Sequence, residues 1–143
     1  MFARSSPPQA NDTAPHRNAL RTRQGTTEQL LATIEALPPG QLAPSLGAHA
    51  ARYRARLATQ DGEKAKAERG FATAASTFRE YAMPFYLAVT LTEHGEWLTS
   101  QGQSEEAQPL LAEGRETFER LDAKPWLERL EAVATSAPAT LTA

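Results

Sequence analysis

The feature of this sequence that most constrains its fold is an internal repeat of forty residues. Segments 44–82 and 84–122 carry small, apolar and glycine positions in the same order. Self-similarity at a period of about 20–50 residues is typical of stacked supersecondary units, none of which buries its apolar face alone. Adding forty leads from the first set to the second: Gly62, Ala67, Phe71, Ala74, Phe78 and Tyr81 become Gly102, Ala107, Leu111, Gly114, Phe118 and Leu121.

Apolar periodicity predicts that each unit is a pair of helices. Steps of four and three residues mark one face of a helix, so we expect the first helix at 44–59 and the second after the break at Asp61-Gly62. Pro84 disfavours helical geometry at Met83 and fits the first turn of the next helix. In the second unit we expect helices at 84–100 and 104–122, with Ser104 as the N-cap residue.

The first helices of the two units align at an offset of forty-one rather than forty. Pro84 reaches Pro125 at the same offset. We therefore expect one residue to be lost in the turn before Gly102 and one to be gained before Pro125. The residues expected to face inward on these two helices are Leu46, Ala50, Tyr53 and Leu57, matched to Leu87, Leu91, His94 and Leu98.

Shorter helices are expected on both sides of the two units. Thr26 and Gln29 have the spacing of a capping box and predict a helix at 27–37. Pro125 opens a last helix at 125–134, with its apolar side chains facing inward.

The predicted fold is an all-α, antiparallel helix-hairpin solenoid of about six helices. The helical-repeat domain spans 26–134. Residues 1–25 are polar and rich in proline, which predicts a disordered leader, and 135–143 read as a frayed tail.

Composition excludes several classes of protein. The chain has no cysteine, so it has neither disulfides nor thiolate metal sites. It lacks a run of about 18 apolar residues, so we expect no membrane span. Its first ten residues lack the apolar stretch of a signal peptide, so we expect a cytoplasmic location. Fifteen basic and seventeen acidic residues without a long run of either sign argue against nucleic acid as a partner.

No catalytic or cofactor-binding motif is present. The sequence lacks a phosphate-binding G-x-x-x-x-G-K-[ST] loop and a G-x-S-x-G nucleophile elbow. Glu93, His94, Glu96 and the distant His49 are the most plausible metal ligands, but ligands on a helix need one-turn spacing and these do not share a face. We interpret them as a polar cluster and expect a non-enzyme without metal or cofactor.

The second unit resembles the tetratricopeptide repeat. The resemblance lies in the spacing Gly95-x-x-Leu98-x-x-x-Gly102-x-x-x-x-Ala107-x-x-x-Leu111-x-x-Gly114. Leucines stand at two positions where that family has aromatic residues, and the unit is about six residues longer than the standard repeat. The resemblance implies a scaffold that binds other proteins.

Longer repeats of this kind resemble the C-terminal helical region of large bacterial signalling ATPases, of the regulator type or linked to adenylate or guanylate cyclase domains. The resemblance covers residues 27–133. It implies a second hypothesis, in which the chain is a regulatory appendage or truncated remnant of such a protein and works beside an ATPase or cyclase domain. It rests on three segments: Met83-Pro84-Phe85-Tyr86-Leu87-Ala88, Glu93-His94-Gly95-Glu96-Trp97-Leu98 and Lys124-Pro125-Trp126-Leu127-Glu128-Arg129.

The first helices of the two units are expected to carry the partner-binding residues. We predict contacts from Arg52, Arg56, Glu93, Glu96 and Trp97. Trp97 has two interpretations: it packs against the neighbouring hairpin, or it is an exposed aromatic anchor, since aromatic residues dominate binding hot spots.

Trp126, on the last helix, is a further candidate contact. It caps the stack, or it forms a homodimer contact, or it marks a face that a missing repeat once covered.

Overall fold

The computed structural model describes residues 25, 27–38 and 40–136, and in this part of the chain it is all-α. The predicted leader, apart from residue 25, falls outside the described residues, as do Thr26 of the capping box and the tail after Ser136. Six helices are described and no strand. They are a first helix at residues 27–35, α2 (Pro44–Gln60), α3 (Lys64–Glu80), α4 (Pro84–Ser100), α5 (Ser104–Arg120) and α6 (Lys124–Ser136).

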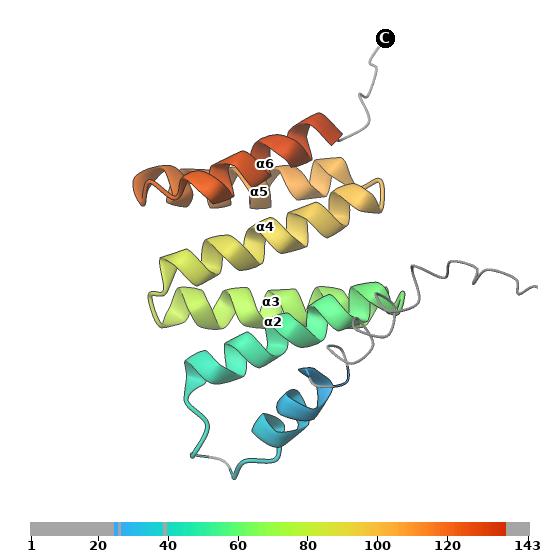
Figure 1. Ribbon diagram of the computed structural model, residues 1–143, viewed down its shortest axis with the longest axis vertical. Coiled ribbons are helices and arrows are strands. Elements are labelled where there is room, and N and C mark those ends of the chain that lie inside the picture. Colours follow the sequence, from blue (N-terminus) through green and yellow to red (C-terminus); the bar gives the residue numbers. More distant parts are fainter. Residues whose placement is uncertain (1–24, 26, 39, 137–143) are drawn as a thin grey trace, which may run out of the picture.

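The helices stack as antiparallel hairpins. α2 packs chiefly on α3 and α4 chiefly on α5, while α6 lies against both α5 and α4. α2, α4 and α6 form a front layer, and α3 and α5 lie behind it (Figure 1). The predicted all-α helix-hairpin fold is therefore confirmed. Among the described helices, none combines the length and the apolar character needed to cross a membrane.

The repeat is more regular than the sequence indicated. Helices α2 to α6 begin at residues 44, 64, 84, 104 and 124, and α2 to α5 are each 17 residues long. The offset between the two units is therefore forty throughout. The predicted offset of forty-one for the first helices, with one residue lost and one gained in the turns, is wrong.

The inward face of α2 was predicted only in part, since Ala50 is buried and Leu57 half-buried as expected. Leu46 and Tyr53 are 39% and 38% exposed, while small residues of α2 are buried in their place. Adding forty to Ala48, Ala55 and Ala58 leads to Ala88, Gly95 and Leu98, all buried on α4. α2 lies close to α3, and its alanines face inward. Larger side chains of α2 lie at the edge of the packed surface, so a prediction from hydropathy alone wrongly places them in the core.

The four turns between α2 and α6 have the same geometry. At each turn, one residue adopts a positive φ, and the N–H of the next residue donates to the carbonyl five residues earlier, as in a Schellman motif. This geometry fixes where the following helix begins, so the N-cap residue of α5 is Gln103 and not Ser104. The positive-φ residues are Gly62 (73°), Ala82 (52°), Gly102 (77°) and Asp122 (54°).

Most of the predicted core is confirmed. Phe71 and Phe78 of α3 and Phe118 of α5 are fully buried, together with the inward leucines of α4. Tyr81 and Leu121, which the repeat aligns, are 52% and 44% exposed, because the helices end before them and they lie in turns. Pro109 lies inside α5, which begins five residues before it, at Ser104.

Candidate functional site

Two adjoining cavities form a groove across α2, α4 and α6, called here the three-helix groove. The first encloses about 290 Å³ and the second about 540 Å³. They share Glu96, Ser100 and Arg129, so they adjoin along these residues. The first is lined by Arg56, Thr59, Gln60, Phe71, Glu93, Glu96, Trp97, Ser100 and Arg129, and the second by Glu96, Thr99, Ser100, Arg129, Ala132 and Val133.

A buried ion pair lies at the α2 side of the groove. Arg52 Nη1 donates to Glu93 Oε1 at 2.6 Å, and each side chain is 8% exposed. Arg56 Nη1 lies 3.5 Å from the other carboxylate oxygen of Glu93 and is 49% exposed. Glu93 therefore holds α4 to α2, and Arg56 presents its guanidinium to the groove with a weaker internal partner.

A second ion pair joins α4 to α6. Arg129 donates through Nε and Nη2 to the two carboxylate oxygens of Glu96, each at 2.6 Å. This paired hydrogen bond raises the pKa of Arg129, although burial opposes the rise. The same guanidinium lies 4.7 Å from the centroid of the Trp126 ring. The pair fixes the wall of the groove between the two helices.

Aromatic side chains of α3 and α4 pack against one another at the groove. His94 stacks on Phe71 with ring centroids 4.9 Å apart, and the Trp97 ring lies 6.3 Å from Phe71 and 6.1 Å from His94. Trp97 therefore packs toward the neighbouring hairpin and also lines the groove. Burial lowers the pKa of His94.

The structure brings four of the six predicted residues into one groove. Arg56, Glu93, Glu96 and Trp97 line it, and Arg52 lies next to it through its pair with Glu93. Their contact with a partner stays a prediction.

Trp126 lies apart from the groove. Its ring stacks on Phe118 with centroids 5.3 Å apart and approaches Phe85 at 6.3 Å. It packs against the core cluster of α4, α5 and α6. Its contact with a groove residue is that of its ring with the Arg129 guanidinium.

Sequence reasoning missed the contribution of α6 to this site. Arg129 completes the groove, yet it comes from a helix that the sequence marked only by its tryptophan and apolar residues. The one signal in the sequence was that Glu96 has no basic residue three or four positions away on its own helix, which leaves it free to pair with another helix. Choosing Arg129 requires the register between α4 and α6, and the sequence did not supply it.

The two histidines considered as metal ligands have separate aromatic surroundings. His49 lies between Phe78 and Tyr86, with centroids 4.9 and 4.5 Å away. Within the described residues, no group of three His, Cys, Asp or Glu side chains could hold a metal ion.

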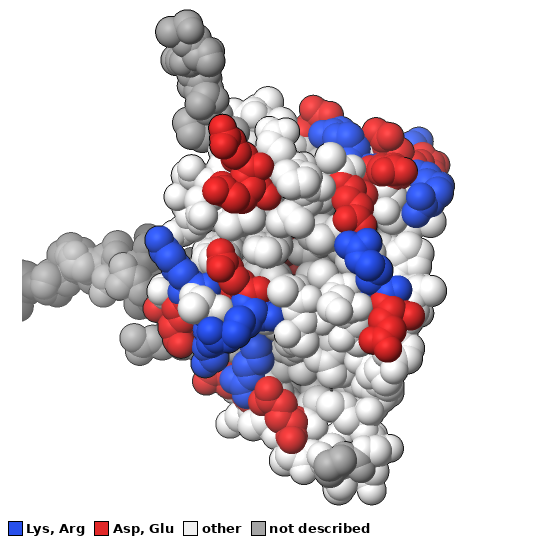
Figure 2. All heavy atoms as spheres, turned by 180° about the vertical axis from the view of Figure 1, so that it is seen from behind, with Lys and Arg blue, Asp and Glu red and all other residues white. Residues whose placement is uncertain are grey.

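The opposite side of the molecule has a mixed charge distribution. Figure 2 shows acidic and basic side chains next to one another in groups toward the two sides of this face, with uncharged surface between the groups. Arg79, for example, pairs with Glu113 at 2.8 Å. Such alternation is typical of solvated helix surfaces.

Comparison with known proteins finds no matching family model, no matching curated protein and no matching solved structure.

Proposed function

We propose that this protein is a non-catalytic scaffold that binds a segment of a partner protein in the three-helix groove. The observation that carries the proposal is the convergence in one groove of Arg56, Glu93, Glu96 and Trp97, residues chosen from the sequence as partner contacts. They come from two helices of the repeat and meet Arg129 of a third.

The chemistry of the groove suits a peptide. Its wall combines a tryptophan with arginine side chains, two residue types enriched in protein interfaces. The Arg52–Glu93 and Glu96–Arg129 pairs hold the three helices in register before any partner arrives. A preformed groove lowers the entropy that binding must overcome.

The dimensions of the groove set the length of the bound segment. Packed helices lie about 8–10 Å apart, so a segment crossing three of them spans about 20 Å. An extended chain covers this distance with about six residues. We therefore expect a short linear segment, with an acidic side chain near the exposed guanidinium of Arg56.

The experiment measures the affinity of a co-purified partner for matched variants. Ser100→Trp fills the groove and Arg56→Ala removes its exposed cation, whereas Ser76→Trp and Arg69→Ala make the same changes at exposed positions of α3. We expect each groove variant to weaken binding about tenfold or more by isothermal titration calorimetry. Equal effects at the groove and on α3 would contradict the proposal.

The non-catalytic part of the proposal has its own test. The purified chain should neither bind nor hydrolyse ATP, since its sequence carries no phosphate-binding loop. ATP hydrolysis that co-purifies with the folded chain and is lost on unfolding would overturn it.

A further inference from the structure

The junction between α3 and α4 differs in chemistry from the equivalent junction between α5 and α6. Ala75 of α3 packs against the buried apolar cluster that contains Leu91 of α4. Forty residues later, the same two positions hold Arg115 and Glu131, which form an ion pair at 3.1 Å. An apolar contact at the centre of the stack is thus replaced by an exposed ion pair at its end.

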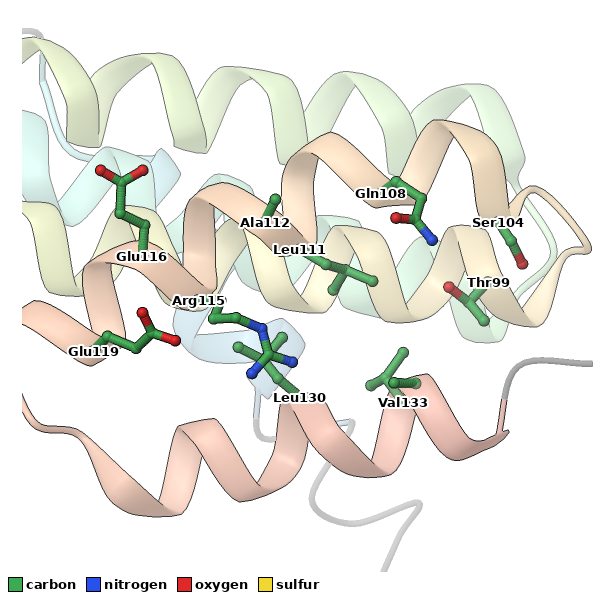
Figure 3. Close-up of a pocket in the computed structure, with 11 residues that line it drawn as sticks. Thr99, Ser104, Gln108, Leu111, Ala112, Arg115, Glu116, Glu119, Leu130 and Val133 are labelled. Atoms are coloured by element: carbon green, nitrogen blue, oxygen red, sulfur yellow. The ribbon is translucent and has the colours of Figure 1, made fainter. Parts of the chain in front are cut away.

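Arg115 of this ion pair lines a cleft. The cleft encloses about 380 Å³ between α5 and α6 and has Leu111, Leu130 and Val133 among its lining residues. Figure 3 shows the Arg115 side chain extending from α5 toward α6, beside Leu130. The lining is mixed, because polar side chains stand beside these apolar ones: Thr99, Ser104, Gln108, Arg115, Glu116 and Glu119.

In the centre of the stack, the next helix covers the equivalent junction. Leu110 of α5 packs against the cluster of Ala75 and Leu91, and Glu113 of α5 pairs with Arg79 of α3 at 2.8 Å. The position equivalent to Arg79 on α5 is Glu119, which is exposed. A helix placed over α5 and α6 in the manner of α5 would therefore meet Arg115 and Glu131 in place of an apolar surface.

An ion pair also lies at the other end of the stack, where one of its two residues is at an equivalent position. Glu35 of the first helix stands forty residues before Ala75 and pairs with Arg54 of α2 at 2.7 Å. Both outer junctions therefore carry an ion pair near the position where the central junction is apolar. Terminal units of repeat proteins need polar outer faces to stay soluble.

We propose that Arg115 and Glu131 close the α5–α6 junction, so that a second copy of the chain cannot dock a helix there and extend the stack. The side chains are 37% and 67% exposed, so a covering helix would strip both of water. Desolvating an ion pair is costly unless the covering surface supplies matching hydrogen bonds. This inference does not depend on what binds in the three-helix groove, which adjoins the cleft at Thr99 and Val133.

The experiment restores the apolar pair. The double variant Arg115→Ala/Glu131→Leu recreates the residues of the central junction, and Arg79→Ala/Glu113→Leu makes the same chemical change on an exposed pair of the back layer. Sedimentation equilibrium measures self-association of each, with circular dichroism as a check of folding. We expect the first variant to associate at least about tenfold more strongly than the wild type and the second to stay monomeric.

Three outcomes would overturn the proposal. The first is a folded Arg115→Ala/Glu131→Leu variant that stays monomeric, and the second is equal association of both double variants. The third is a wild-type dimer that Glu131→Lys dissociates, which would show that the end of the stack is an interface. If the double variant fails to fold, Arg115→Ala alone opens the cleft without adding a leucine and takes its place.

Discussion

Each turn between α2 and α6 depends on one residue with a positive φ. Glycine adopts this conformation at Gly62 and Gly102, but Ala82 and Asp122 adopt it at the other two turns. A side chain with a Cβ atom is strained there, whereas glycine is not. The protein tolerates the strain because the flanking helices and the Schellman hydrogen bonds fix the turn.

Ala82→Gly should therefore stabilise the protein. Relief of the strain at φ 52° outweighs the larger backbone entropy of glycine in the unfolded chain, and we expect a gain of about 1 kcal/mol in the free energy of unfolding. Urea denaturation measures it. Gly102→Ala is the reverse control and should lose a similar amount; a less stable Ala82→Gly variant would contradict the account of the turns.

The stability of the protein should fall as the solution becomes acidic. Burial lowers the pKa of His94 below its usual value near 6.5, with Glu68 opposing, and burial and Arg52 lower that of His49. The unfolded chain then binds protons more readily than the folded one, so the histidines' stabilisation is complete above pH 6.5 and decreases as the pH falls below it.

The measurement is urea denaturation between pH 5 and about 8. His94→Phe keeps a ring against Phe71 and removes the titrating group, so its stability should depend less on pH than that of the wild type. An unchanged slope would show that His94 does not contribute.

Each hairpin needs a small residue where its two helices come closest. On α4, a Cβ atom added to Gly95 would lie 2.6 Å from Cδ2 of Leu111 on α5. On α2, the equivalent Ala55 approaches Gly70 of α3, where an added Cβ would lie 2.8 Å from that of Ala55. At these contacts, the α4–α5 hairpin has its small residue on α4, opposite a leucine. The α2–α3 hairpin has a small residue on each helix.

Gly95→Ala should destabilise the protein although alanine favours a helix. We expect a loss of about 1–3 kcal/mol from overpacking against Leu111, more than the roughly 1 kcal/mol that alanine contributes by propensity. Gly47→Ala is the matched control, because its new Cβ would meet only Leu42 at 3.5 Å, and it should stabilise α2. Thermal denaturation of the two variants distinguishes them, and a stabilised Gly95→Ala would contradict the packing at this crossing.

The sequence predicted the helices and turns well because their signals are local. Pro44 and Pro84 open α2 and α4, and Gly62 and Gly102 mark the turns. On the inward face of α2, Ala50 was predicted, but Ala55 and Ala58 could not be, since they differ little in hydropathy from exposed alanines. The pairing of Arg129 with Glu96 also escaped, because it depends on how two helices align in space.

At the scale of the whole molecule, ion pairs connect the hairpins. Arg52 of α2 and Glu93 of α4 are buried together, while Arg79 and Glu113 are exposed on the back layer. Breaking a buried pair leaves a charge without a partner or water, whereas an exposed pair contributes little. The register of the first hairpin on the second therefore depends strongly on Glu93.

Glu93→Gln should accordingly cost far more stability than Glu113→Gln. We expect about 3–5 kcal/mol for the first and at most about 1 kcal/mol for the second. Urea denaturation of both variants at neutral pH measures the difference. Equal losses would mean that Arg52 finds water or another acceptor when Glu93 is neutral.

The central claim is that the three-helix groove receives the partner, and site-specific photo-crosslinking tests it most directly. The photo-reactive residue p-benzoylphenylalanine replaces Ser100 in the groove or, as the control, Ser76 on α3, in cells that produce the protein. The account predicts one discrete product from Ser100 that contains a partner segment, is weakened by Arg56→Glu and is missing from Ser76. The same product from both positions, or cross-links from Ser76 alone, would contradict it.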